Sequence, residues 1–292
     1  MTNNGTALEV KNLAKHFGGV YAVDNLSLKI EKGSITALVG PNGSGKTTLI
    51  NLISGLLSID GGAVVVGGAA LGRILPQELP AYGITRTFQN VRLFEQMPVL
   101  DNILFVLTER GVFGALFERH SEFHLKHAEE VLRLVGLWEK RNELAVNLSY
   151  GQRKLLEIAR AYAMCNIASK EGSGGKYEVP PVEENREAGV RNRGFLRRRR
   201  SRRHAVNNNN VEILLFDEPF AGLFPAMAET VAEVFRALKA AGKTIILVEH
   251  DMGIIRRLTD YVFVLDSGKL LAEGKPDEVL ARREVVEAYL GE

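Results

Sequence analysis

The stretch Gly40-Pro41-Asn42-Gly43-Ser44-Gly45-Lys46-Thr47 decides the fold of this chain. It fits G-x-x-x-x-G-K-[ST], the pattern of a loop that cradles phosphate groups with successive backbone N–H groups. Its glycines permit turns that a Cβ atom would forbid. The apolar run 35–39 before it predicts a buried strand, and residues 48–53 after it predict a helix. The loop therefore lies at a helix N-terminus, where the helix dipole favours an anion.

Two side chains of this loop have the chemistry that a nucleotide needs. Lys46 can reach the β- and γ-phosphates, and Thr47 can hold Mg²⁺. A glycine-rich turn that matches by chance is the alternative, but strand, loop and helix are all in register. We therefore predict a nucleotide site with Mg²⁺. Its predicted nucleotide-binding residues here are Gly40, Pro41, Asn42, Gly43, Ser44, Gly45, Lys46, Thr47 and Thr48.

Length and composition limit the number of domains and the class of protein. The 292 residues are enough for one large or two modest domains, and 46% hydrophobic with 25% charged residues is ordinary for a globular protein. A net charge of +2 argues for no particular partner. The single cysteine, Cys165, excludes a disulfide within the chain and fits a reducing, cytosolic compartment. Residues 1–6 do not resemble a signal peptide, and no apolar run approaches the ~20 residues that span a bilayer.

The periodicity predicts an antiparallel layer followed by alternating strands and helices. Alternating residues at 8–13 and 26–30 predict half-buried strands ahead of the phosphate loop. Residues 82–88 predict another strand, and residues 97–164 take helical spacing as an inserted subdomain. After residue 211, strands alternate with helices, which predicts a parallel α/β sheet. Ligand groups are then expected at the carboxyl ends of its strands.

Two acidic residues follow the buried strand at 211–216. Asp217 can hold Mg²⁺ together with Thr47, and Glu218 can orient or deprotonate an attacking water. A solvated strand end is the alternative for an adjacent acidic pair, but the strand and the phosphate loop favour the functional interpretation. Asp217 is thus a predicted metal ligand and Glu218 a predicted catalytic residue.

Three further residues have both a functional and an ordinary interpretation. Gln89 can bind Mg²⁺ or water, or be a surface residue at a strand end. His250 can donate to a γ-phosphate oxygen, or be an ordinary strand-end histidine. Phe17 can stack on an adenine ring, although spacing alone favours a core phenylalanine beside Gly18-Gly19.

Residues 166–210 differ from the rest of the chain. They show no apolar periodicity, and residues 197–203 are six arginines and one serine. This composition predicts a polar, basic, disordered insert. A basic run can also contact RNA, DNA or acidic lipid, which remains the alternative.

Leu148-Ser149-Tyr150-Gly151-Gln152 resembles the LSGGQ signature of ATP-binding-cassette (ABC) ATPases, with tyrosine in place of the first glycine. The order of phosphate loop, Gln89, signature, Asp217-Glu218 and His250 is the order found in that family. The resemblance covers residues 7–165 and 211–292. It implies a single domain over 7–292: a P-loop NTPase (RecA-like) core of α/β class, an N-terminal antiparallel β layer and an inserted α-helical subdomain.

The resemblance also implies a role for each residue that matches the family pattern. Gln89 would face the membrane subunit, Phe17 would stack on adenine, and His250 would be the switch histidine. Lys46, Glu218 and His250 would form the catalytic set. Ser149, Gly151 and Gln152 would bind the ATP held by a second ABC ATPase subunit, because this family sandwiches two ATP molecules in a head-to-tail dimer. The metal set would be Thr47, Gln89 and Asp217.

Finer features are similar to the LivG-type ATPases of branched-chain amino acid importers. These are residues 86–94, the Ser-Tyr-Gly-Gln signature and the ending at 288–292. The similarity implies an ATPase subunit on the cytoplasmic face of the inner membrane, with two transmembrane permease subunits and, indirectly, an extracytoplasmic solute-binding protein. ATPases of lipopolysaccharide-export and urea-type transporters resemble the chain enough to remain alternatives.

Two departures from the family pattern favour rival interpretations. Phe224 stands where the D-loop usually has Asn or Asp, and phenylalanine cannot make polar contacts across the dimer, so a non-hydrolysing regulatory subunit is one rival. The basic run within the insert is the only feature that favours a soluble ATPase acting on nucleic acid or ribosomes. Such proteins generally carry two cassettes or a long coiled coil, and this chain has neither, so nucleic acid is not an expected partner.

Overall fold

The central sheet carries the phosphate loop at the end of one of its inner strands. In the computed structural model, which describes residues 5–86, 93–107, 122–166 and 211–290, its order is β10-β9-β3-β8-β7-β6. All neighbouring pairs are parallel except β9 and β10, which confirms the predicted parallel α/β sheet. The strands are β3 (Ile35–Val39), β6 (Ile84–Arg86), β7 (Ile213–Asp217), β8 (Thr244–Val248), β9 (Tyr261–Asp266) and β10 (Lys269–Gly274).

Both faces of this sheet are buried, and alternate residues of each strand face opposite sides. In β3, Leu38 packs with α1 (Lys46–Ile53) and the antiparallel strands, whereas Ala37 and Val39 pack in the cluster formed by the other helices. In β7, Leu215 joins the first cluster and Phe216 the second. The side-chain period of two thus produces two apolar cores from continuous apolar strands.

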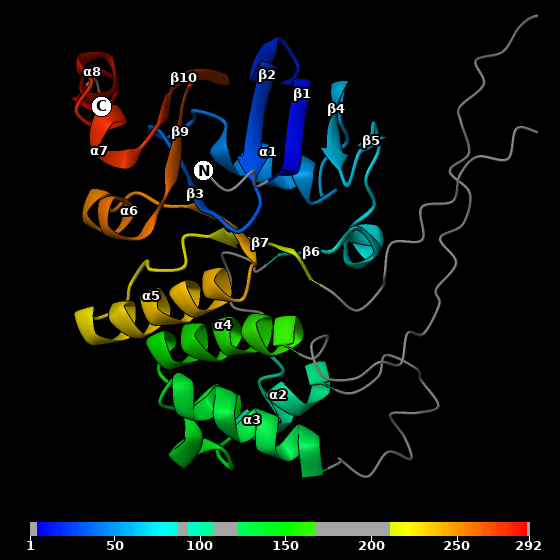
Figure 1. Cartoon of the computed structure of the whole chain (residues 1–292), viewed down its shortest axis with the longest axis vertical. Helices are drawn as coiled ribbons and strands as arrows, with labels where there is room; N and C mark the ends of the chain where they lie inside the picture. Colours follow the sequence, from blue (N-terminus) through cyan, green and yellow to red (C-terminus); the bar gives the residue numbers. More distant parts are fainter. Residues whose placement is uncertain (1–4, 87–92, 108–121, 167–210, 291–292) are drawn as a thin grey trace, which may run out of the picture.

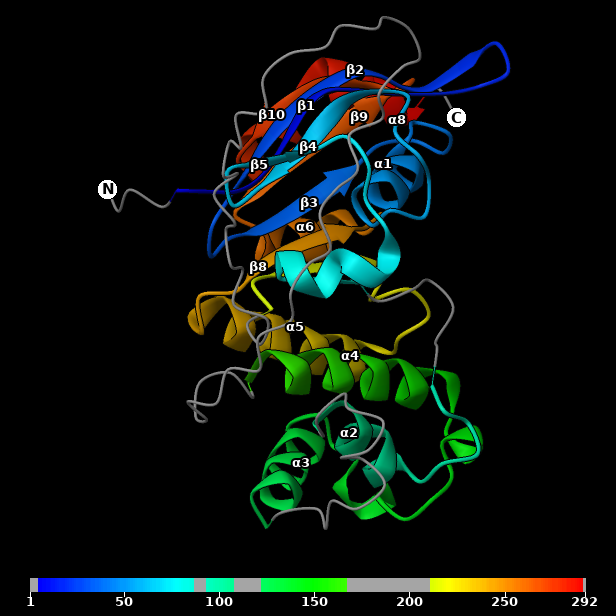
Figure 2. The same ribbon diagram turned by 90° about the vertical axis from the view of Figure 1, so that its right-hand side faces the viewer.

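A second, antiparallel sheet covers the α1 side, as Figures 1 and 2 show. Its order is β2-β1-β4-β5, and Leu8, Leu26 and Val64 are fully or almost fully buried beneath it. This confirms the antiparallel layer that the alternating residues predict. The strands are β1 (Thr6–Phe17), β2 (Val20–Glu31), β4 (Gly61–Val66) and β5 (Ala69–Leu71).

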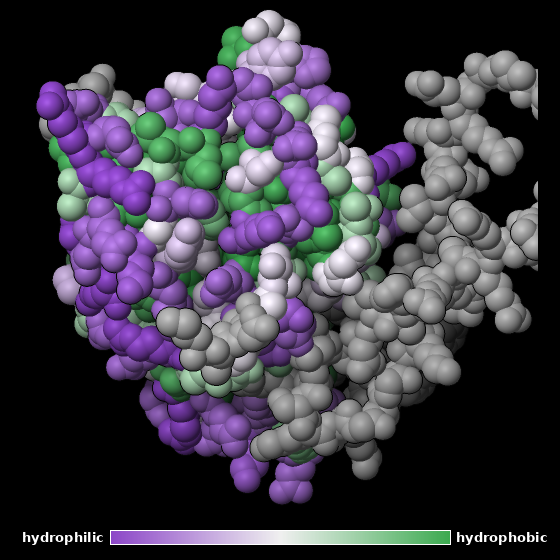
Figure 3. All heavy atoms as spheres, turned by 45° about the horizontal axis from the view of Figure 1, so that its top comes forward, coloured by the Kyte–Doolittle hydropathy of each residue, from purple (hydrophilic) through white to green (hydrophobic). Residues whose placement is uncertain are grey.

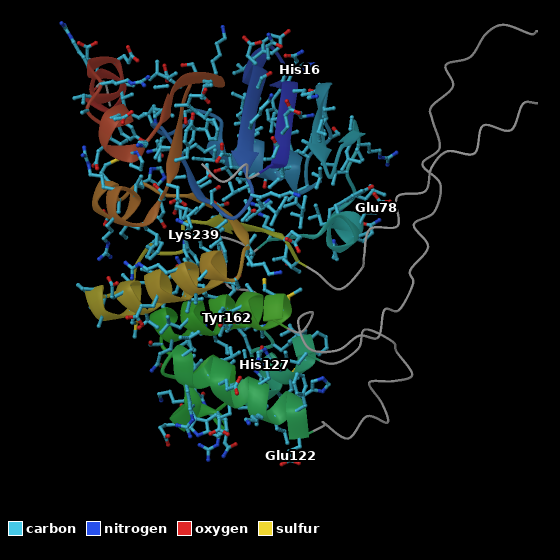
Figure 4. The ribbon with its side chains drawn as sticks, viewed as in Figure 1. His16, Glu78, Glu122, His127, Tyr162 and Lys239 are labelled. Atoms are coloured by element: carbon cyan, nitrogen blue, oxygen red, sulfur yellow. The ribbon has the colours of Figure 1, made fainter. Side chains whose placement is uncertain are left out.

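The opposite side of the core sheet is covered by helices. Both views show α5 next to the sheet, α4 packed on α5, and α2 and α3 beyond α4 (Figures 1 and 2). His127 of α3 and Tyr162 of α4 are labelled in Figure 4 in the zone where these helices meet. The helices are α2 (Val99–Leu107), α3 (Glu122–Leu134), α4 (Tyr150–Asn166), α5 (Pro225–Ala240), α6 (Met252–Leu258), α7 (Pro276–Val279) and α8 (Arg283–Leu290), with short 3₁₀ turns at Pro76–Tyr82, Trp138–Lys140 and Ala145–Asn147.

Some local predictions were wrong in their bounds. Tyr82, expected in a strand, ends a 3₁₀ helix, because Pro80 lacks the N–H that a sheet ladder needs and Gly83 turns the chain with a φ of 70°. The strand that follows is only Ile84–Arg86 within the described residues. The expected final helix is two short helices, since the chain turns between them and buries both Val279 and Val285.

Several predictions fall outside the described residues: Gln89, the basic run at 197–203 and nearly all of the polar insert. Within the described ranges, none of the helices has the length and apolar character needed to cross a bilayer. Hydrophilic residues cover much of the described surface in Figure 3, and apolar residues show in the hollows between them.

Candidate functional site

The phosphate loop connects β3 to α1 and is shaped by close contact with two other strands. Gly40 and Gly45 have φ angles of 145° and 101°. A Cβ atom at Gly40 would lie 2.0 Å from the Leu265 carbonyl oxygen, and one at Gly45 would lie 2.3 Å from the Ala22 carbonyl oxygen. Both positions require glycine for its backbone conformation and for space. The structure thus explains both glycines that define the pattern.

Lys46 lies buried at the start of α1, with its side chain folded back into the loop. Its Nζ donates to the carbonyl oxygens of Gly40 and Pro41, each at 2.7 Å, and to Ser44 Oγ at 3.4 Å. The charge is therefore held inside the turn that would surround a phosphate. Asn42, Gly43 and Thr47 are exposed at its rim. This is a cradle for an anion with one fixed cation.

Two predicted catalytic residues follow core strands near β3: Glu218 follows β7 and His250 comes shortly after β8. Because β8 lies between β3 and β7, the residues after all three strands meet at one edge of the sheet. His250 Nε2 is 3.2 Å from Glu218 Oε1. Glu218 has a φ of 51°, a left-handed conformation that non-glycine residues adopt only where their surroundings enforce it. The two side chains thus lie within hydrogen-bonding distance of each other beside the phosphate loop.

Asp217 is buried and paired with a cation to which the sequence analysis assigned no role. Its Oδ2 is 3.2 Å from Arg86 Nη2, and the same guanidinium donates to Asn51 Oδ1 on α1 and to Ser54 Oγ, the C-cap residue of α1. Burial raises the pKa of the Asp217 carboxyl above its ordinary value, and the charge of Arg86 opposes that shift. Arg86 therefore ties the carboxylate to α1 from the strand that leads toward Gln89.

A second acid, Glu249, was also missed. It is 3% exposed, and its carboxylate accepts from the backbone N–H of Phe220 at 2.9 Å and of His250 at 3.2 Å. Burial raises its pKa to about 7, against the opposing effect of those two hydrogen bonds. Glu249 therefore connects the segment after β7 with the segment after β8. A glutamate directly after a buried strand was the only sequence signal for it.

The signature residues begin α4 and cap it. Gln152 Oε1 accepts from the Ser149 N–H at 3.0 Å, while Ser149 Oγ accepts from the Gln152 N–H at 3.3 Å, a reciprocal capping box. A Cβ atom at Gly151 would lie 2.6 Å from Met227 Sδ of α5. Figures 1 and 2 show α4 separated from α1 by α5. The structure therefore brings His250 beside the phosphate loop and Glu218 beside His250, whereas the signature lies apart from the phosphate loop.

Two aromatic residues of interest are exposed. Phe17 is 50% exposed at the end of β1, with Lys15 Nζ 5.4 Å from its ring centroid. It is therefore not the core residue that spacing alone favoured. Phe224 is 76% exposed and takes the N-cap position of α5 without any side-chain cap. An Asn or Asp at this position could cap the helix, which phenylalanine cannot do.

The residues present fit a nucleotide with Mg²⁺. A hard cation prefers oxygen ligands, and Mg²⁺ commonly uses one or two protein oxygens besides phosphate and water. Asp217 supplies a carboxylate and Thr47 a hydroxyl. The described part of the chain holds no cluster of three or more His, Cys, Asp or Glu side chains that could bind a metal alone. A cavity of about 410 Å³ opens beside the loop, lined by Gly40, Pro41, Asn42, His250 and residues of α6 and α8.

Comparison with known proteins agrees with this geometry. Residues 23–166 match the family described as ABC transporter, and residues 269–292 match the family described as branched-chain amino acid ATP-binding cassette transporter. A relative in Archaeoglobus fulgidus, a probable branched-chain amino acid transport ATP-binding protein LivG, is 33% identical over 97% of this chain and 95% of its own. The high-affinity LivG protein of Salmonella typhimurium is also 33% identical and covers 98% of both chains.

A solved structure extends the comparison to three dimensions. The ADP conformation of an ATP-binding cassette of an ABC transporter superposes with a TM-score of 0.71 at 30% identity, covering 99% of this chain and 100% of the other. Sequence and fold thus agree over nearly the whole length, and the expected cassette fold is confirmed. This chain belongs to the ATP-binding proteins of ABC transporters, ATPases of the LivG-like group.

Proposed function

We propose that this ATPase drives an importer of branched-chain amino acids from the cytoplasmic face of the membrane. ATP-binding cassettes dimerise, and the proposal includes a second cassette, two permease subunits and, indirectly, an extracytoplasmic solute-binding protein. The Glu218–His250 pair beside the phosphate loop is the observation that carries the hydrolytic role. The C-terminal match at 269–292 and the names of the two LivG relatives support the choice of solute.

The geometry suggests how the chain's own residues divide the reaction. The Glu218 carboxylate accepts the proton of an attacking water, and His250 Nε2 lies 3.2 Å from that carboxylate. When ATP is bound, His250 would donate toward the γ-phosphate. Lys46 and the loop N–H groups stabilise phosphate charge. Thr47, Asp217 and Gln89 would hold Mg²⁺, which neutralises phosphate charge when bound. Phe17, exposed at the end of β1, would stack on the adenine.

The separation of the signature from the loop supports a composite site. Ser149, Gly151 and Gln152 would bind the nucleotide held by the partner cassette, because α5 lies between them and their own phosphate loop. One chain thus supplies half of each of two sites. Closure on two ATP molecules would move the permease subunits, and hydrolysis would reset them.

Glu218→Gln tests the hydrolytic role. Because the amide cannot accept the proton, we expect steady-state ATP hydrolysis to fall about a hundredfold or more while ATP binding persists. Hydrolysis is measured by phosphate release and binding by fluorescence with a labelled ATP. Glu233→Gln on α5, which lies outside the site, is the matched control. Unaltered turnover in Glu218→Gln would show that the proton acceptor is another group.

The solute is tested by purifying the chain with its membrane partners and assaying uptake in vesicles. We expect ATP-dependent uptake of leucine, isoleucine or valine that Glu218→Gln abolishes. Uptake of urea, or extraction of lipopolysaccharide, without amino acid uptake would replace the proposed solute while leaving the ATPase role intact. If the assembled complex hydrolyses no ATP, the result would favour the rival interpretation of this chain as a non-hydrolysing regulatory subunit.

A further inference from the structure

Lys154 is a buried cation in the signature helix that reaches the segment carrying Glu218. It lies on α4, two residues after Gln152, and is 6% exposed. Its Nζ donates to the carbonyl oxygen of Glu218 at 2.7 Å and to that of Ala221 at 2.9 Å. Residue 154 was not predicted as a site residue, and nothing in the local sequence separates it from an exposed helical lysine.

The segment that Lys154 binds has an unfavourable backbone conformation. Glu218 has a φ of 51°, where a side chain crowds its own backbone. The lysine charge stabilises two carbonyl oxygens of this turn, and hydrogen bonds to a charged group are stronger than neutral ones. On the other side of the turn, the Glu249 carboxylate accepts from the Phe220 N–H. Side chains from two other elements, Lys154 and Glu249, therefore hold the turn through its carbonyl oxygens and its Phe220 N–H.

The same lysine also contacts the signature itself. Its Nζ lies 5.5 Å from the ring centroid of Tyr150, one helical turn earlier on α4. Tyr150 packs against the turn as well, since a Cβ atom at Gly222 would lie 3.0 Å from its ring. The start of α4 and the residues 218–222 therefore form one packed unit, although 64 positions separate Lys154 from Glu218 in the sequence.

We propose that Lys154 is a positioning residue that holds Glu218 in its proton-accepting conformation and couples it to the signature. The inference rests on the proposed function, in which Glu218 accepts the proton and the signature binds the partner's ATP. Through Lys154, a shift at the start of α4 on contact with that ATP moves the backbone of this chain's own Glu218. Each nucleotide then influences hydrolysis at the other site.

Removing the charge of Lys154 should slow ATP hydrolysis without weakening ATP binding. In Lys154→Met, which keeps the length of the aliphatic stem but not the charge, we expect kcat to fall about tenfold or more with KM for ATP nearly unchanged, since a small displacement of a catalytic group is costly. Positive cooperativity in ATP should weaken as well. Lys154→Arg keeps the charge and should restore part of kcat. Lys140→Met is the control, because Lys140 is a partly exposed lysine in the same stretch of the chain that pairs with Glu143 and not with the Glu218 turn.

A mutant cycle separates positioning from general structural damage. Full-length wild type, Glu218→Gln, Lys154→Met and the double variant are assayed under single-turnover conditions, with thermal unfolding recorded for each. If Lys154 acts through Glu218, the double variant hydrolyses ATP no more slowly than Glu218→Gln alone. Additive losses, or a parallel rise in KM and loss of stability that Lys154→Arg does not rescue, would overturn the proposal.

The single variants distinguish the proton-acceptor role of Glu218 from the positioning role of Lys154. Glu218→Gln turning over as fast as wild type would overturn both the proton-acceptor role and the positioning role. Normal loss in Glu218→Gln together with wild-type kcat in Lys154→Met would overturn the positioning role alone.

Discussion

The connection from β7 to α5 and the connection from β8 to α6 leave the same edge of the core sheet, and each carries a predicted catalytic residue. After β8, Asp251 Oδ1 accepts from the N–H groups of Gly253 and Ile254, at 2.8 and 3.1 Å, and caps α6. After β7, Phe224 begins α5 with no side-chain cap. The β8–α6 connection is thus capped by one of its own residues.

The β7–α5 connection, in contrast, is held by residues from elsewhere in the chain. Lys154 of α4 binds its carbonyl oxygens, and Glu249 from the neighbouring strand end binds its Phe220 N–H. Such an arrangement makes the position of Glu218 depend on how α4 and β8 pack. A loop with local support keeps its shape, whereas one with distant support can respond to movement of the elements that hold it. The difference places sensitivity to the partner's nucleotide in the β7–α5 connection.

Glu249, which touches both connections, should produce the largest effect. Burial raises the pKa of Glu249 to about 7 in the folded chain, whereas an unperturbed glutamate has a pKa of 4.5. The folded state therefore binds the extra proton in this window, and the free energy of unfolding falls as pH rises from 4.5 to 7, then levels off. In Glu249→Gln we expect that pH-dependent loss to shrink by about 3 kcal/mol.

The measurement is urea unfolding of wild type and Glu249→Gln at pH 5 and pH 8, compared as a difference so that other titrating groups cancel. Glu233→Gln, on the exposed part of α5, serves as the control. Identical pH dependence in wild type and Glu249→Gln would mean that the Glu249 proton is not held by the fold.

Gly222→Ala tests the distant support of the β7–α5 connection. Gly222 has a φ of 72°, and the added Cβ would lie 3.0 Å from the Tyr150 ring. We expect a loss of about 1–3 kcal/mol in the free energy of unfolding. Gly242→Ala, at a φ of 79° with no atom near the new Cβ, reports the backbone effect alone. Equal losses in calorimetry would show that Tyr150 does not press on this turn.

Asp251→Ala tests the local support of the β8–α6 connection. Loss of the two cap hydrogen bonds should lower the free energy of unfolding by about 1 kcal/mol. Asp251→Asn, which can still accept both hydrogen bonds, should retain most of that stability. Denaturant melts of the three proteins check the order, and an alanine variant as stable as wild type would contradict the capping role.

Phe224→Asn should give the smallest effect, in the opposite direction. It supplies the missing cap of α5 and removes an exposed aromatic ring, so the free energy of unfolding should rise by about 0.5–1 kcal/mol. Phe224→Ala removes the ring without adding a cap and is the matched control. If both variants are equally stable by thermal unfolding, capping is not what this position lacks.

The sequence allowed prediction of the site residues that belong to local patterns. Gly40 to Thr47 could be predicted because a phosphate loop needs glycine where the backbone is crowded, and the structure shows Leu265 and Ala22 at the two tightest points. The apolar strands predicted which residues would share the sheet edge. The Glu218–His250 pair then follows from the adjacency of β7 and β8, although the sequence contains no direct signal for that adjacency.

Arg86, Lys154 and Glu249 could not be predicted as site residues. Each acts through a partner remote in sequence: Arg86 through Asp217, Lys154 through Glu218 and Ala221, and Glu249 through Phe220. The sequence around a charged residue that becomes buried looks the same as the sequence around one that stays exposed. Spacing alone favoured a core position for Phe17, which is half exposed, because spacing does not reveal which strand lies beside a residue.

By itself, then, the sequence determined the elements, the phosphate loop and the identity of the chemical groups, since backbone preferences and apolar periodicity act between near neighbours. Only the tertiary structure decided which of those groups meet. Strand order brings the acids to His250 and the loop, and helix packing sets α4 against the β7–α5 connection. Burial then holds ordinary lysine, arginine and glutamate side chains in fixed positions, because a buried polar or charged group is stable only with partners that the fold supplies.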